Sequence, residues 1–152
     1  MKPPAPDARV SPADLKAILS FIPRLETLDA EGIWSKEPKI SVRDRKILIQ
    51  SGAYQPIIGE FVEALYAHRF IRRYDWGKWQ AQAVRFYNNP ELIGRARMRT
   101  CVKLLTLHIR KDKFVDGHLG GMLLKGHITA ILRRMAELAG HLQVGAFDPD
   151  LM

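Results

Sequence analysis

Hydrophobic residues recur every three or four positions along most of this chain, which is the spacing of amphipathic helices. The first stripe follows Ser11, with Pro12 at the first helical position and Asp14 three residues after the Ser N-cap. Pro23 should end or kink this helix, because proline lacks the amide hydrogen that a helix interior needs. A second amphipathic stripe begins at Gln55 and predicts another helix.

The C-terminal half predicts four more helical segments. A turn near Gly77 precedes a helix that should bury Trp79, and Asn89 before Pro90 offers a new N-cap. Residues 91–111 are apolar around much of the helical cylinder, so we expect this long helix at the centre of the domain. Shorter patterns predict a helix over residues 117–125 and a last helix that ends near Gly140.

Residues 29–53 give the least clear pattern. Two short apolar runs, at residues 39–42 and 46–50, are compatible with extended or helical structure, and neither is strong enough to predict a sheet. We therefore predict an all-α fold, a compact single-domain bundle of about five or six helices over residues 11–140. A flexible Pro-rich arm at residues 1–10 should precede it, and an irregular tail at residues 141–152 should follow.

Composition places the chain among folded proteins. Its 152 residues are 47% hydrophobic and 26% charged, which argues against disorder. There is no apolar window of the roughly 18 residues that a membrane span needs, and no secretory leader, so we expect no membrane contact and a cytoplasmic location. The single cysteine, Cys101, lies in an apolar helical pattern and should act as a small buried hydrophobe.

Three motifs follow one another in the C-terminal two thirds: aromatic-Asp-Trp-x-x-Trp, then Leu-Leu-Thr leading to Arg-x-Asp-Lys-Phe-x-x-Gly, then Ile-Leu-x-Arg. Their positions are Tyr74, Asp75, Trp76 and Trp79, then Leu104, Leu105, Thr106, Arg110, Asp112, Phe114 and Gly117, and finally Ile131, Leu132 and Arg134. Over roughly residues 15 to 140 the chain resembles a family of bacterial and phage proteins known only as a domain of unknown function. The resemblance implies no known activity.

Two positions depart from the pattern of that family. Lys113 stands where the family has Arg, and the basic stretch at residues 95–99 stands where it has an acidic residue. An ammonium group lacks the planar fork of a guanidinium, so Lys113 cannot reproduce a bidentate Arg contact.

The formal charge of +8 points to an anionic partner. At 100° per residue, Arg99, Lys103 and Arg110 fall within about 40° of one another on the long helix. Our first hypothesis is a non-catalytic protein whose basic face, including also Arg72 and Arg73, contacts nucleic acid or a nucleoprotein complex. Alternatively, these cations are solvated and paired with the 16 acidic residues, while the tryptophans pack in the core.

A different class of function is a protein-interaction module. It would be a phage- or defence-related inhibitor that binds an acidic protein partner, or a homodimer formed through an apolar patch. The phage link comes from the family resemblance alone. Cation clusters that share one face favour nucleic acid, whereas scattered clusters with an exposed apolar patch favour a protein partner.

The corner at residues 110–121 has a structural and a functional interpretation. In the structural one, Asp112 or Asp116 caps the next helix, Phe114 inserts into the core, and three glycines, at 117, 120 and 121, allow close backbone approach. In the functional one, Asp112, Asp116 and His118 form a polar pocket for acid–base chemistry, which would make the protein an uncharacterised enzyme. We favour the structural interpretation.

Metal and cofactor sites are not indicated. His118 and His127 could meet across Gly126, but no H-x-x-x-H pair and no third ligand accompany them, so we expect no metal. The chain has no phosphate-binding loop, nucleophile elbow or dinucleotide fingerprint, and we expect no cofactor.

Overall fold

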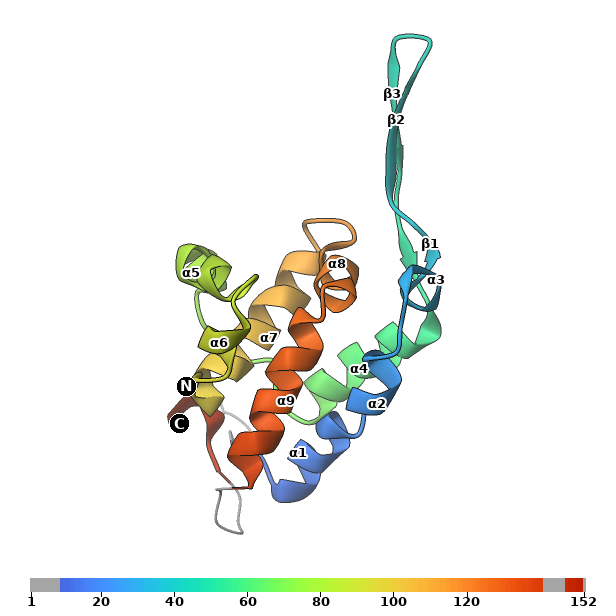
Figure 1. Ribbon diagram of the computed structural model, residues 1–152. Helices are drawn as coiled ribbons and strands as arrows, with labels where there is room; N and C mark the ends of the chain where they lie inside the picture. The colour runs from blue at the N-terminus through green and yellow to red at the C-terminus, as the bar shows by residue number, and fades with distance from the viewer. Residues whose placement is uncertain (1–8, 141–146, 152) are drawn as a thin grey trace, which may run out of the picture.

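The fold is mainly helical, with two small antiparallel sheets between its third and fourth helices (Figure 1). The computed structural model describes residues 9–140 and 147–151, the side chain of residue 151 excepted. The helices are α1 (Pro12–Leu19), α2 (Ile22–Leu25), α3 (Ala30–Ile33), α4 (Pro56–Ala67), α5 (Trp76–Ala83), α6 (Pro90–Ile93), α7 (Met98–Asp112), α8 (His118–Leu124) and α9 (His127–Ala139), with 3-10 turns η1 (Val84–Phe86) and η2 (Pro149–Leu151). The strands are β1 (Trp34–Lys36), β2 (Lys39–Arg43), β3 (Lys46–Gln50) and β4 (Ala53–Tyr54).

Local capping signals set several helix boundaries. The Oγ of Ser11 accepts a hydrogen bond from the Asp14 amide at 3.0 Å, and the Asp14 carboxylate accepts one from the Ser11 amide at 2.8 Å, which confirms the predicted start of α1. Pro23 lies in the first turn of α2, beyond the end of α1. The expected turn near Gly77 is wrong, because Asp75 caps α5 two residues earlier and Gly77 lies inside the helix.

Helix α7 lies at the centre of the core, as its apolar surface predicts. It packs against α5, α8 and α9, and nine of its residues are buried. Cys101 is among them, and burial raises the pKa of its thiol to about 12. The helical segments outnumber the five or six expected, since α6 and α7 are separate and several others are single turns. Within the described residues, none of the helices is long and apolar enough to span a bilayer.

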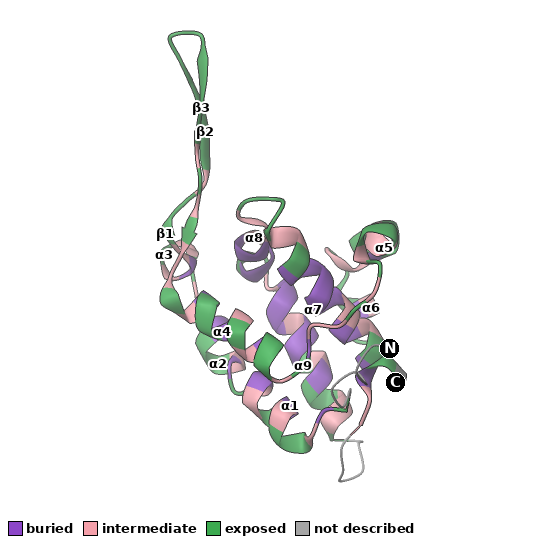
Figure 2. Ribbon diagram, turned by 180° about the vertical axis from the view of Figure 1, so that it is seen from behind, coloured by how far each residue is buried: buried purple, intermediate pink, exposed green. Residues whose placement is uncertain are grey.

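The prediction of an all-α fold is wrong for residues 34–54. Strands β2 and β3 form a hairpin in which Ile40 pairs with Ile49 and Val42 with Ile47. Its two-residue turn has Asp44 at φ 51° and Arg45 at φ 61°, a left-handed conformation that matches the twist of paired strands. Beside it, β1 and β4 pair at the base of the hairpin. The hairpin extends away from the helices, and nearly all its length is exposed (Figure 2).

The two ends of the described chain meet. Val10 and Phe147 exchange both backbone hydrogen bonds as an isolated bridge, and Val10 is buried. Val10 thus packs into the core although it falls within the predicted arm. The rest of that arm up to residue 8, and residues 141–146 of the predicted tail, lie outside the described residues.

Candidate functional site

The β2–β3 hairpin has two chemically different faces. Residues opposite each other in an antiparallel pair share a face, and so do residues two apart along a strand. The apolar ridge, as we call one face, therefore consists of Ile40, Val42, Ile47 and Ile49. The polar face consists of Lys39, Ser41, Arg43, Lys46, Leu48 and Gln50. Three cations thus lie on one side of the ribbon, and a fourth, Arg45, lies in the turn.

The hairpin cations are exposed and make no ion pair with any described residue. Some cations of the helical body are paired, since Arg24 pairs with Glu60, Arg133 with Glu26, and Arg134 with Glu137. Asp44 is the one acidic residue within the hairpin at residues 39–50. The hairpin therefore carries an uncompensated positive charge at a distance from the core.

A hydrogen-bond network fixes the base of the hairpin to the corner between α7 and α8. The hydroxyl of Tyr54 donates to Asp112 Oδ1 at 2.6 Å and accepts from the Gly120 amide at 2.9 Å. The same Asp112 oxygen accepts from the Leu119 amide at 2.8 Å. Burial, with the Asp112 carboxylate next, raises the pKa of Tyr54, so this hydroxyl keeps its proton and its role as donor.

Close backbone approach completes the joint between the base of the hairpin and the α7–α8 corner. Asp116 Oδ2 accepts from the Gly52 amide at 2.8 Å, just after β3. A Cβ on Gly120 would lie 2.4 Å from the Trp34 ring, and one on Gly117, at φ 79°, would lie 2.8 Å from Pro38. Only glycine fits at either position. The β1 and β4 end of the ribbon is therefore held rigidly against the helices.

These contacts match the structural interpretation of the corner more closely than the polar pocket. Asp112 caps the first turn of α8 as expected, and Asp116 bonds to the ribbon rather than facing His118. Two details differ. Phe114 does not insert into the core, because its side chain is 78% exposed, although its ring lies 6.0 Å from that of Trp76. A Cβ on Gly121 would meet open space, so no close backbone approach requires glycine at that position.

The cations that the sequence singled out have different surroundings. Arg72 is held by Asp148 and Asp150 at 3.3 and 3.1 Å, and its side chain is only 9% exposed. Lys103 lies over the rings of Tyr74 and Trp79, and its pKa is lowered, chiefly by burial. The remaining three are exposed and make no ion pair with a described residue: Arg73, Arg99 and Arg110.

Three histidines form a cluster that the sequence showed only in part. The sequence suggested that His118 and His127 could meet directly. Instead, each forms a hydrogen bond with His108, which lies between them. His108 Nδ1 lies 2.9 Å from His118 Nε2, and His108 Nε2 lies 2.9 Å from His127 Nε2. The ring of Tyr87 packs beside all three.

Burial keeps this cluster neutral. It lowers the pKa of His118 and of His127 to about 4, with the neighbouring Lys125 contributing to both, and it lowers the pKa of His108 well below its ordinary value. The two nitrogens of His108 point to different neighbours and do not converge on one point. Among the described residues, no group of three or more His, Cys, Asp or Glu side chains is placed to hold a metal ion.

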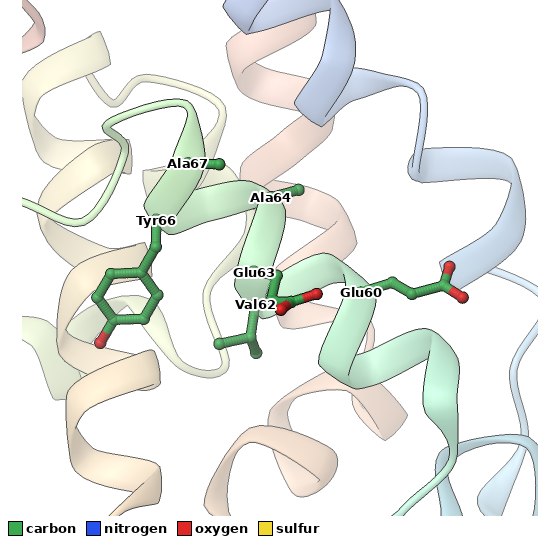
Figure 3. A pocket seen from close by; sticks show the side chains of 6 residues that line it. All are labelled: Glu60, Val62, Glu63, Ala64, Tyr66 and Ala67. Atoms are coloured by element: carbon green, nitrogen blue, oxygen red, sulfur yellow. The ribbon is translucent and has the colours of Figure 1, made fainter.

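A shallow depression follows the outer side of α4 (Figure 3). Its lining comes from this single helix: Glu60, Val62, Glu63, Ala64, Tyr66 and Ala67. Figure 3 shows the two carboxylates and the Tyr66 ring pointing in different directions. Because the described lining includes no second element, the depression cannot enclose a small molecule, and the hairpin is the stronger candidate site.

Comparison with known proteins gives a family but no activity. No curated protein and no solved structure matches the chain. One protein family matches residues 10–141, a range that includes the hairpin, the corner and the histidine cluster. The chain belongs to the family of unknown function DUF6508.

Proposed function

We propose that this chain is a non-catalytic nucleic-acid-binding protein that uses the β2–β3 hairpin as a basic arm. The observation that carries the proposal is the group of cations, Lys39, Arg43, Arg45 and Lys46, which projects from the body without ion-pair partners among the described residues. Such cations replace the counterions of a phosphate backbone and so gain affinity for any nucleic acid.

The dimensions of the arm suit this partner. A two-stranded antiparallel ribbon enters a B-DNA major groove, which is about 12 Å wide. The polar face and the turn would meet the phosphates, while the hydrogen bonds at Tyr54 and Asp112 hold the base of the arm in place. A fixed base reduces the entropy lost when the arm binds.

The corner between α7 and α8 extends the positive surface from the arm onto the body. Arg110 lies in the last turn of α7, and Lys111 and Lys113 follow it, next to the residues that anchor the hairpin. Of the five cations first chosen from the sequence, Arg110 is the one closest along the chain to Asp112, which anchors the arm. Arg99 lies at the opposite end of α7, roughly 15–20 Å away along the helix axis.

A catalytic function has less support. One oxygen of each carboxylate is already engaged: Asp112 Oδ1 accepts from Tyr54 and from the Leu119 amide, and Asp116 Oδ2 accepts from the Gly52 amide. A general base must instead reach the proton that it removes from a substrate.

The test compares two triple variants with the same change of charge. One is Lys39→Gln, Arg43→Gln and Lys46→Gln, which leaves the turn intact; the other is Arg95→Gln, Arg97→Gln and Arg99→Gln at the far end of α7. Wild type and both variants are titrated against short duplex DNA, single-stranded DNA and RNA by fluorescence anisotropy. We expect the hairpin variant to lose at least about tenfold in affinity and the α7 variant to change little.

Two outcomes would overturn the proposal. One is the absence of binding by wild type to all three nucleic acids at low salt. The other is an equal loss in the two triple variants, which would mean that net charge and not the arm carries the binding. Circular dichroism of each variant confirms that the helical body remains folded.

A further inference from the structure

The apolar ridge of the hairpin is exposed to an unusual degree. The side chains of Ile40, Val42, Ile47 and Ile49 are 78%, 73%, 69% and 74% exposed. All four are β-branched and lie side by side as two cross-strand pairs. They belong to a ribbon that extends beyond the helices in both views (Figures 1 and 2), so no helix of the body covers them.

The apolar face of such a ribbon should be covered by another structural element or by another molecule. A two-stranded hairpin alone in water is marginally stable, and it usually requires further strands or a packed helix on its apolar face. The polar face does not supply this, because its one large apolar residue is Leu48. A contiguous group of exposed aliphatic side chains on a folded protein marks a contact surface for another macromolecule.

The distribution of charge argues against a polyanion on the ridge. No charged side chain interrupts the ridge, while Lys39, Arg43 and Lys46 all lie on the reverse side. A polyanion would meet the polar face and leave the ridge exposed to water. A matching uncharged aliphatic surface is present on another molecule of the same chain. We infer that the ridge packs against the same ridge of a second copy, forming a twofold-symmetric dimer.

Packing of this type follows the geometry of a β-sandwich. Two ribbons would stack about 10 Å apart with their β-branched side chains interdigitated. A twofold axis makes the contact self-complementary, since each ridge sees the same four residues. The cations of both copies then point outward on opposite sides, where their mutual repulsion is small and each stays available to an anionic ligand.

The size of the ridge sets the strength of the dimer. Strands of five residues span about 17 Å at about 3.4 Å per residue, so the contact is smaller than the roughly 800 Å² per partner of a standard interface. We therefore expect weak, reversible association. Dimerisation through the ridge does not require that the polar face bind nucleic acid, and it is measured without any nucleic acid present.

Sedimentation velocity over a range of protein concentrations tests this association. Two neighbouring substitutions on opposite faces form a matched pair: Ile47→Thr on the ridge and Leu48→Thr on the polar face. Threonine is β-branched, a shape that strands favour, so it suits the strand at either position. The Ile47→Thr variant should raise the dimer dissociation constant by more than roughly tenfold, because the change occurs twice in a symmetric contact, and Leu48→Thr should leave it within about twofold.

Cross-linking gives a second readout, which compares a cysteine on each face of the hairpin. Val42→Cys on the ridge should be joined efficiently by a thiol reagent with an arm of about 10 Å, and Ser41→Cys on the reverse side should not. The native Cys101 is buried and does not compete. A wild-type monomer at every concentration up to the millimolar range would overturn the inference, as would a dimer that Ile47→Thr leaves intact or equal cross-linking at the two cysteine positions.

Discussion

Acidification from pH 7 to pH 5 should destabilise the fold through the histidine cluster. Burial lowers the pKa of His127 to about 4 in the folded protein, against an ordinary value of 6.5. Between these values the unfolded chain binds a proton that the folded chain does not bind, so the free energy of unfolding falls as the pH falls. The same sign applies to His108 and His118, whose pKa values burial also lowers.

The magnitude follows from the lowered pKa of His127, a residue that is 3% exposed. Complete titration below pH 4 would cost about 3 kcal/mol, at about 1.4 kcal/mol for each pH unit between the two pKa values. At pH 5 the loss from this one residue is about 2 kcal/mol. Asp14, whose pKa is lowered chiefly by its hydrogen bond with His68, loses its contribution only at lower pH and does not confuse the comparison.

Urea unfolding followed by circular dichroism at pH 7 and at pH 5 measures this loss. The wild type should lose at least about 2 kcal/mol. His127→Gln removes the titrating group, so its loss between the two pH values should be smaller by about 2 kcal/mol, whatever its stability at pH 7. Equal stability of the wild type at the two pH values, or an unchanged pH dependence in His127→Gln, would refute the reasoning.

Three further predictions concern the joint and the core. Gly120→Ala places a methyl group against Trp34 and should cost about 1–3 kcal/mol in thermal unfolding, with a changed tryptophan emission; an unperturbed variant would contradict the close approach. Tyr54→Phe removes a hydroxyl that both donates and accepts, and should lower the stability by about 1–3 kcal/mol while making the hairpin easier to cleave by protease; unchanged cleavage would argue against its anchoring role. The Cys101 thiol should resist a chromogenic thiol reagent until the protein unfolds, so rapid reaction in the native state would show that the thiol is accessible.

Much of the helical fold could be predicted from local sequence. The Ser11 cap, the stripe after Gln55 and the apolar surface of α7 act within a few residues, so periodicity and capping reveal them directly. The hairpin was missed because its turn is Asp44-Arg45 and not the Asn-Gly that marks such turns most clearly. The alternation of Ile40 with Val42, and of Ile47 with Ile49, was the signal that was available.

The candidate site could be predicted less well than the helices, because it is built from contacts between residues that are distant in the sequence. The role of Asp112 as a helix cap could be predicted because its partner, Leu119, is seven residues away. Tyr54 as the second partner could not, because 58 residues separate it from Asp112. For the same reason the sequence placed Arg72 on a basic face, whereas acidic groups more than 70 residues later neutralise it.

The salt dependence of nucleic-acid binding tests the role of the hairpin most directly. For duplex DNA, the slope of the logarithm of the binding constant against the logarithm of the salt concentration changes by about 0.9 for each phosphate contact. If the arm contacts the backbone, the Lys39→Gln, Arg43→Gln, Lys46→Gln variant should have a slope smaller in magnitude by about 2 to 3 than the wild type. The Arg95→Gln, Arg97→Gln, Arg99→Gln variant should keep the wild-type slope. A reduced slope in this second variant, with the wild-type slope in the first, would contradict the account. It would place the nucleic-acid interface at the N-terminal end of α7 instead.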